Sequence, residues 1–412
     1  MVSVCFYFQV HQPYRVRKYS VFEIGEANDY FSDKSESNLN NKKIIEKVSE
    51  KCYLPTNNVM LELIKKHPEF KISYSLSGTL MEQLEEFSPK TLSSFQELAD
   101  TGKVEFLSET YHHSLAFLFS KPEFRGQVIL HKKKIQELFN QTPKVFRNTE
   151  LIFNNELAKE VADMGYLGTL LEGADHVLGW RSPNFVYNSV MNNNLKLLLK
   201  NYRLSDDIAF RFSERSWQDW PLTAPKFANW INAINGDGNT VNLFMDYETF
   251  GEHQWESTGI FDFLRHLPGE LLKHPDNDFK TPSEVMKSYP SVGDIDVHNF
   301  LSWADVERDL SAWLGNPMQE SAISTLYHLR DDILKTGDKE LIALWRKLQT
   351  SDHFYYMCTK WFADGDVHKY FNPYESPYEA FISFMNVIHD LRIRINELKK
   401  LKTTNGQNIY KL

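Results

Sequence analysis

The chain has 412 residues, of which 42% are hydrophobic and 25% are charged. These proportions are typical of a globular protein and exclude disordered and fibrous architectures for most of the chain. The length fits one large barrel with an appendage, or two to three domains. Acidic residues number 55 and basic residues 46, so the formal net charge is −9. This balance argues against a nucleic-acid partner, because phosphate binding requires a positive surface.

The cysteines and the first residues indicate the cellular compartment of the protein. Cys5, Cys52 and Cys358 lie far apart and form no CxxC pair, which predicts a reducing compartment and no structural zinc site. The opening residues lack the basic region and cleavage site of a secretory signal and predict a first strand. No run approaches the roughly 18 consecutive apolar residues of a membrane span. We therefore predict a cytoplasmic protein without membrane association, unless a leader precedes this sequence.

Short runs rich in β-branched and aromatic residues alternate with helical patterns. The predicted strands cover residues 2–10, 71–77, 104–108, 145–149, 168–171, 202–205 and 240–245. The helices predicted between them cover residues 56–66, 79–100, 121–139, 154–164 and 224–234. Strands that alternate with helices indicate parallel βαβ units. Seven successive units favour a barrel over an open sheet, although the count alone does not decide between them.

The pattern changes after about residue 300. Helices without intervening strands are predicted at residues 304–314, 318–336, 338–349 and 377–400. We therefore predict a catalytic barrel domain over residues 1–300 and a helical domain over residues 301–412 that contributes to the active-site cleft. The polar segment 25–41 predicts a long loop over one face of the barrel.

Ionisable side chains follow most of the predicted strands. They are His11, Glu109, His112, His113, Glu150, Glu172, Asp206, Asp207, Asp246 and Glu248. In a parallel α/β barrel the catalytic groups lie at the C-terminal ends of the strands. Any one charge could mark only where a strand meets solvent, but their joint occurrence predicts an active site. Two facing carboxylates can cleave a glycosidic bond, whereas an Asp and His set can hold a metal for deacylation or phosphoester cleavage.

Several of these residues lie in longer motifs. HQP at 11–13, NTELIFNNELAKEVADMGY at 148–166 and FMDYETFGEH at 244–253 resemble conserved regions of glycoside hydrolase family 57. EGADHVLGWRSPN at 172–184 and DLSAWLGNPMQ at 309–319 are similar to its α-amylase-like members. The resemblance implies an α/β fold, an incomplete seven-stranded (β/α) TIM-like barrel followed by a C-terminal helical domain. It also implies a retaining mechanism that uses no metal and no cofactor.

The resemblance assigns the two catalytic carboxylates. The family's nucleophile falls on Glu150 and its general acid/base on Asp246. Each follows an apolar run, so the barrel would fix the backbone while the carboxylate meets the cavity. The competing interpretation of Glu150 is a carboxylate that interacts with the dipole of the next helix. Glu248 alternates with Asp246, and it either points to the same side or binds a loop.

Other side chains are candidates for sugar contacts. His11 could donate a hydrogen bond to the sugar at the cleavage point, or it could be a core histidine. His113 stands where many relatives carry a Glu-Pro, which leaves the local sugar contacts uncertain, and His253 could reach bound glucan. Trp180 with Arg181, Trp220 and Trp313 are candidate stacking platforms, and Trp313 fits a core position equally well.

The sequence thus predicts a retaining glycoside hydrolase whose partner is an α-1,4-glucan or a maltooligosaccharide. A 4-α-glucanotransferase acting at the same site is one alternative. A second is a metal-dependent polysaccharide deacetylase or mannosidase-like enzyme, and a third is a non-catalytic glucan-binding protein. The oligomeric state stays open.

Overall fold

The computed structural model describes residues 2–35, 37–360 and 367–409, and for residues 401–409 it describes the backbone alone. The chain divides into two compact units. The first comprises Met1–Gln12, Ile45–Tyr111 and Gly126–Ala304, and the second comprises Pro13–Ile44, His112–Arg125 and Asp305–Leu412. Every strand that the structure describes belongs to the first unit.

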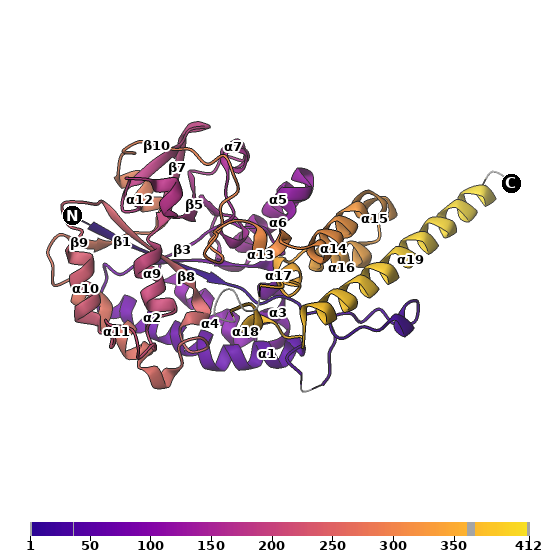
Figure 1. Ribbon diagram of the computed structural model, residues 1–412, viewed down its shortest axis with the longest axis horizontal. Coiled ribbons are helices and arrows are strands. Elements are labelled where there is room, and N and C mark those ends of the chain that lie inside the picture. The colour runs from indigo at the N-terminus through magenta and orange to yellow at the C-terminus, as the bar shows by residue number, and fades with distance from the viewer. Residues whose placement is uncertain (1, 36, 361–366, 410–412) are drawn as a thin grey trace. The chain divides into compact units, whose positions relative to one another are not determined.

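The first sheet has the strand order β3-β2-β1-β8, and β9 adds to it by pairing with β1. Its strands are Val2–Val10 (β1), Ile72–Leu76 (β2), Val104–Phe106 (β3), Thr240–Asp246 (β8) and Asn277–Phe279 (β9), and all its pairs are parallel (Figure 1). Gln9 lies opposite Ser75 on one side and opposite Asp246 on the other. The C-terminal ends of β2, β1 and β8 therefore meet at one edge.

The second sheet has the order β10-β6-β7-β5-β4. Its strands are Val145–Arg147 (β4), Gly168–Glu172 (β5), Val186–Ser189 (β6), Asn192–Lys200 (β7) and Asp294–Ile295 (β10), and only the β6–β7 pair is antiparallel. A parallel bridge between Ser108 and Phe146 joins this sheet to the segment after β3. On the other side the amide of Asn201 donates to the carbonyl of Asn242 at 2.9 Å, beside β8. The α/β class is confirmed, while the number of barrel strands stays a prediction.

The parallel strands are buried on both faces, which explains why they read as continuous apolar runs. Phe6 and Phe8 on β1 lie on one face of the sheet with their ring centroids 5.7 Å apart, and the Phe6 ring lies 6.2 Å from that of Phe70, between α2 (Leu54–Lys66) and β2. Their neighbours Cys5 and Tyr7 point the other way. These two join a core cluster that also contains Leu107, Val145, Leu151, Leu170, Val186, Leu198, Phe244, Val285 and Met286.

Helices lie at all five ranges predicted in this part of the chain. The bounds of the helices are Leu54–Lys66 (α2), Gly78–Phe87 (α3), Pro89–Asp100 (α4), Asn155–Asp163 (α7), Asp175–Leu178 (α8), Tyr202–Ala209 (α9), Ala224–Asn232 (α10), Ile260–Leu271 (α11) and Pro282–Ser288 (α12), while Asn41–Val48 (α1) and Lys121–Phe139 (α6) belong to both units. Of these, α1, α8, α11 and α12 were not predicted. Side chains of Ser77, Asn154 and Thr223 cap α3, α7 and α10 by accepting from backbone amides. The single helix predicted at 79–100 is two helices, because Ser88 leaves the helical conformation and Pro89 starts α4.

The strand predicted at residues 202–205 is wrong. These residues form the start of α9, because the side chain of Asn201 accepts from the amide of Leu204 and so caps the helix. The sixth parallel strand is β7, which ends at Lys200. The residue at the end of this strand is therefore a cation and not the predicted pair Asp206 and Asp207.

The second unit is built from helices and loops. Its helices are Ala116–Phe119 (α5), Ser311–Leu314 (α13), Pro317–His328 (α14), Arg330–Thr336 (α15), Lys339–Lys347 (α16), Ser351–Tyr355 (α17), Val367–Phe371 (α18) and Pro377–Ile409 (α19). The C-terminal helical region is thus confirmed, with one break between α14 and α15. The predicted loop 25–41 belongs to this unit, where the amide of Gly25 and the hydroxyl of Tyr30 both donate to Asp390 on α19.

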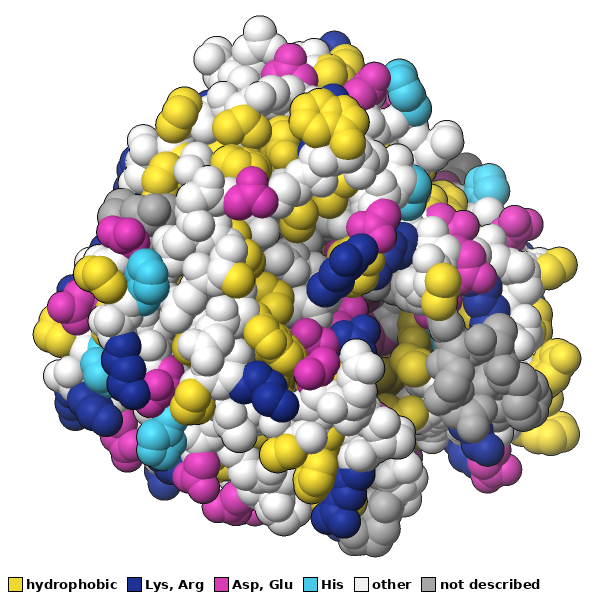
Figure 2. Space-filling model, turned by 60° about the vertical axis from the view of Figure 1, so that its left-hand side comes forward, with side chains coloured by type: hydrophobic (Ala, Val, Ile, Leu, Met, Phe, Trp, Pro, Cys, Tyr) yellow, Lys and Arg dark blue, Asp and Glu magenta, His cyan; other side chains and the backbone are white. Residues whose placement is uncertain are grey.

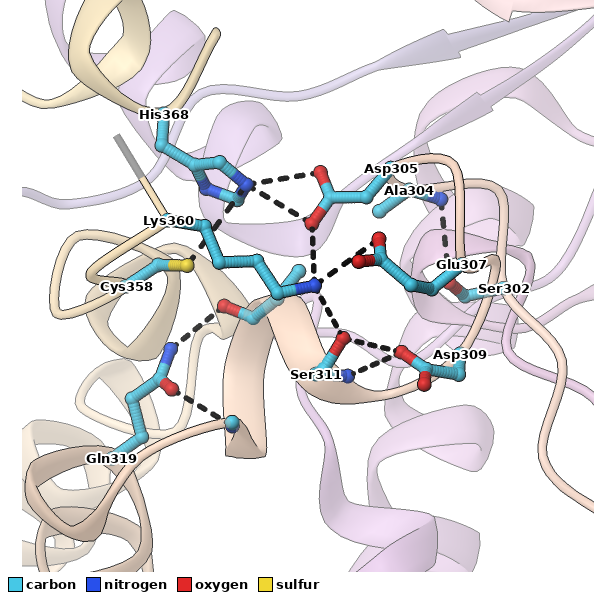
Figure 3. Close-up of polar contacts among 12 residues, drawn as sticks. Ser302, Ala304, Asp305, Glu307, Asp309, Ser311, Gln319, Cys358, Lys360 and His368 are labelled. Carbon is cyan, nitrogen blue, oxygen red and sulfur yellow. Dashed lines mark hydrogen bonds and ion pairs between the residues drawn. The ribbon is translucent and has the colours of Figure 1, made fainter. Parts of the chain in front are cut away.

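The helix predicted at 304–314 is reduced to α13. Asp305 and Arg308 have φ angles of 57° and 51°, which interrupt a right-handed helix. The carboxylate of Asp305 accepts from His368 Nε2 at 2.9 Å and lies 3.5 Å from Lys360 Nζ (Figure 3). Lys360 also contacts Ser311 Oγ at 2.6 Å. The segment before α13 is therefore held by polar contacts with residues that follow α17.

The described residues form no helix that is both long and apolar enough to cross a membrane. On the face drawn in Figure 2, Lys and Arg side chains are interspersed with Asp and Glu side chains and do not gather in one region. All three cysteines are buried and none forms a disulfide.

Candidate active site

Polar side chains occupy the last inward-facing position of five strands in the first unit. Tyr7, Val145, Leu170, Leu198 and Phe244 belong to the core cluster. Because side chains alternate along a strand, the residue two positions further on points the same way. These residues are Gln9, Arg147, Glu172, Lys200 and Asp246. The end of the core is therefore lined by charges of both signs.

Glu150 lies directly after β4 in a short 3₁₀ turn, Thr149–Leu151. Its φ and ψ angles are 58° and 24°, and Leu151 also has a positive φ of 51°. Left-handed backbone in a residue with a side chain costs about 1–2 kcal/mol and persists only where the surroundings enforce it. Leu151 is buried in the core cluster, which anchors this turn. The turn presents the half-buried Glu150 beyond the end of β4.

Trp303 holds the Glu150 carboxylate. Its indole Nε1 donates to Glu150 Oε2 at 2.8 Å, and its backbone amide donates to the Glu150 carbonyl at 3.2 Å. Trp303 was not predicted from the sequence and lies 153 positions further along the chain than Glu150. No motif near it signals the contact.

Asp246 is the last residue of β8 and is half-buried. Two positions later, the buried Glu248 accepts from the amide of His11 at 3.3 Å and from the hydroxyl of Tyr53. Burial, and then the charge of Asp246, raise the pKa of Glu248 to about 8. The Asp246 and Glu248 pair therefore retains a proton at neutral pH.

A buried hydrogen-bond network fixes the side of the site formed by β1 and β2. The hydroxyl groups of Tyr7 and Ser75 both donate to Gln9 Oε1 at 2.9 Å. Gln9 Nε2 in turn donates to Glu109 Oε1 at 3.1 Å. Burial raises the pKa of Tyr7, while the charge of Arg147 lowers it and those of Glu109 and Asp246 raise it. Tyr7 is therefore within electrostatic reach of both Arg147 and Asp246.

The predicted histidines differ in their environment. His11 Nδ1 lies 2.6 Å from Ser77 Oγ, and the His11 backbone contacts Glu248. The amide of His253 donates to the Glu248 carbonyl at 2.9 Å, and burial lowers the pKa of His253 to about 4. These two residues flank the Asp246 and Glu248 segment. His113 belongs to the second unit, where it is buried and its carbonyl accepts from the amide of Ser351 at 2.9 Å.

The predicted tryptophans are also dispersed. Trp180 is 91% exposed, and the Arg181 guanidinium lies 5.6 Å from its ring centroid. Trp220 is 41% exposed. Trp313 is buried in the second unit and lies 6.3 Å from the Tyr355 ring. Trp180 and Trp220 therefore have accessible ring surface, and the burial of Trp313 favours a packing role. Among the residues that the structure describes, no group of three or more His, Cys, Asp or Glu side chains could hold a metal.

Comparison with known proteins identifies the family. Residues 5–298 match the family described as Glycosyl hydrolase family 57. A protein of Methanocaldococcus jannaschii named "Putative alpha-amylase" is 43% identical over 425 aligned residues, which cover 99% of this chain and 89% of the relative.

Two solved structures share the fold. The branching enzyme from Pyrococcus horikoshii is 16% identical with a TM-score of 0.67, covering 90% of this chain and 87% of the other. The α-amylase AmyC from Thermotoga maritima is 11% identical with a TM-score of 0.61, covering 98% and 94%. The family match over residues 5–298 and the 43% identical relative show that the chain belongs to glycosyl hydrolase family 57.

Proposed function

We propose that this glycoside hydrolase cleaves α-1,4-linked glucan with retention, using Glu150 as nucleophile and Asp246 as general acid/base. The observation that carries the proposal is the position of Glu150, in a left-handed turn with its carboxylate held by Trp303. Such a turn costs stability, and strain of this kind is typical of functional residues. The name of the Methanocaldococcus jannaschii relative supports glucan as the substrate.

The chemistry follows from the two roles. Glu150 Oε1 or Oε2 attacks the anomeric carbon while Asp246 gives a proton to the leaving glycosidic oxygen. A covalent glycosyl-enzyme forms, and Asp246 then takes a proton from water, which releases the sugar with its original configuration. Retention requires the two carboxyl groups to approach to about 5–5.5 Å across the bound sugar. The proton comes from the Asp246 and Glu248 pair, which holds one proton at neutral pH because burial and the charge of Asp246 raise the pKa of Glu248 to about 8, and Asp246 passes this shared proton to the leaving oxygen.

The sugar contacts remain predictions. His11 and His253 are supported by their positions beside Glu248. The exposed rings of Trp180, with Arg181, and of Trp220 support stacking on a glucan chain. His113 and Trp313, and with them a contribution of residues 301–412 to the cleft, are carried by the family resemblance alone. The three buried thiols support a reducing, cytoplasmic location.

Incubation with maltoheptaose tests the reaction. Products that are only shorter than the substrate indicate hydrolysis, and a ladder that extends above it indicates glucanotransfer to a sugar acceptor. We expect Glu150→Ala and Asp246→Ala each to lower turnover by at least about 10³-fold while the thermal unfolding curve stays cooperative. Azide should restore cleavage to the Glu150→Ala variant as the glycosyl azide. Retention of most activity by either folded variant would refute the assignment.

A further inference from the structure

Two segments far apart in the sequence are joined at Glu150. Phe153 and Leu301 exchange backbone hydrogen bonds of 2.9 Å in both directions, as in an antiparallel pair. The amide of Trp303 continues this pairing to the Glu150 carbonyl at 3.2 Å. The indole is also packed against the core cluster. The position of Trp303 relative to Glu150 is therefore set by backbone as well as by side chain.

Two cationic side chains lie over the ring of Trp303. The Arg147 guanidinium carbon lies 4.8 Å from its centroid and Lys200 Nζ lies 5.4 Å from it. Lys200 is also engaged with acids, at 3.0 Å from Asp206 and 3.7 Å from Glu172. The charge of Lys200 is therefore largely neutralised by these two acids and not by Glu150.

Arg147 differs from Lys200 in its surroundings. Its side chain is fully buried, and none of its three side-chain nitrogens has a hydrogen-bond partner among the described residues. An arginine stays charged at any pH that proteins tolerate. A buried charge is costly unless an opposite charge lies near it. The Glu150 carboxylate and the Arg147 guanidinium both contact the Trp303 indole, which brings the two opposite charges to one side chain.

The charged groups that act on the neighbours of this indole are mostly acidic. Glu172 on β5 and Asp206 on α9 lie beside Lys200, and Glu109 after β3 and Asp246 on β8 act, together with Arg147, on the hydroxyl of Tyr7. Nearby negative charges disfavour ionisation of a carboxyl group, and a nearby cation favours it. A carboxylate nucleophile must be ionised to attack. The balance of positive and negative charges near Glu150 therefore affects the reaction.

We propose that Trp303 and Arg147 are positioning residues for the nucleophile: the indole N–H aims the Glu150 carboxylate, and the guanidinium stacked on the same ring keeps that carboxylate ionised. This inference rests on the role of Glu150 in the proposed function. Neither residue needs to touch the substrate. Loss of the cation raises the pH at which Glu150 ionises, and loss of the indole N–H allows its carboxylate to turn.

The test is the pH profile of kcat/KM for maltoheptaose in four variants. The acidic limb of this profile reports ionisation of the essential base or nucleophile in the free enzyme. We expect Arg147→Met to move the acidic limb upward by about one pH unit and to lower kcat at least about tenfold. Arg147→Lys keeps the charge and should leave the limb in place. Trp303→Phe keeps the ring and should lower kcat by about 10–100-fold through loss of a hydrogen bond to a charged group.

Arg203→Met is the matched control. Arg203 also stacks on a ring, 5.7 Å from the Tyr202 centroid, and pairs with Asp175 at 3.5 Å, but it is exposed. Its loss should change neither kcat nor the acidic limb. Should Arg147→Met fail to fold, Trp303→Phe and Arg147→Lys still decide, since a Trp303→Phe variant with wild-type kcat overturns the inference.

A second measurement separates this inference from the proposed function. An activated 5-fluoro glycosyl fluoride needs no proton from Asp246, so its rate of covalent labelling reports the nucleophile alone. Labelling on Glu150 with the same acidic limb in wild type and Arg147→Met overturns the positioning inference only. An acidic limb that Arg147→Lys moves as far as Arg147→Met does also overturns it, because charge is then not the cause. Labelling on another residue refutes the proposed function itself.

Discussion

Replacing Glu248 by glutamine should change how the stability of this protein depends on pH. In the folded protein burial and the charge of Asp246 raise the pKa of Glu248 to about 8, whereas the unfolded value is about 4.3–4.5. The folded state thus holds a proton that the unfolded state releases between these pH values. The free energy of unfolding therefore falls as pH rises through this window. From pH 5 to pH 8 the loss for this one group amounts to roughly 3 kcal/mol.

Glutamine removes the titration but keeps an oxygen for the amide of His11 and the hydroxyl of Tyr53. We expect Glu248→Gln to be less stable than wild type at pH 5, by about 1 kcal/mol. At pH 8 it should be the more stable protein, by roughly 2 kcal/mol. Urea denaturation at both pH values gives the two differences.

The control is Glu256→Gln, which alters an exposed carboxyl group and should leave the pH dependence of wild type unchanged. If wild type and Glu248→Gln lost stability in parallel between pH 5 and pH 8, the reasoning would be refuted. Glu248 would then be ionised in the folded protein. The inference that the Asp246 and Glu248 pair keeps a proton at neutral pH would be wrong.

Two further substitutions test the stability of the fold, one in each unit. Gly251 has a φ of 106°, and a Cβ there would lie 2.0 Å from the Lys51 carbonyl oxygen, so Gly251→Ala should cost about 2–4 kcal/mol in a thermal or urea melt. Gly259→Ala, in the left-handed helical region at a φ of 83° and with open space around it, should cost only about 1 kcal/mol, and equal losses would show that the clash is relieved. In the second unit, Arg346 binds the buried Glu123 at 2.8 and 3.2 Å, so Arg346→Met should cost about 1.5–3 kcal/mol by removing two hydrogen bonds between charged groups. The double variant Glu123→Gln with Arg346→Met should recover much of that loss, and failure to recover would mean that packing and not charge explains the effect.

The strands and the positions of their terminal residues could be predicted because these signals are local. The run at 2–10 and the run at 240–245, followed at once by Asp246, are continuous apolar segments that only a strand buried on both faces would need. The helices at 121–139 and 224–234 were predicted from periodicity and correspond to α6 and α10. The strand predicted at 202–205 was wrong because these residues begin α9. The side chain of Asn201 accepts a hydrogen bond from the amide of Leu204 and so caps this helix.

The environment of the catalytic candidates depends on contacts between distant parts of the chain. Apolar periodicity and acidic residues after strands were enough to place Glu150 and Asp246 at strand ends and to indicate carboxylate chemistry. They could not place Trp303 on the Glu150 carboxylate, because that contact depends on the pairing of Phe153 with Leu301. Nor could they show that Arg147 is buried with no hydrogen-bond partner in the described part of the chain, or that Glu248 keeps its proton to about pH 8, because burial and the distance to a neighbouring charge exist only once the chain has folded.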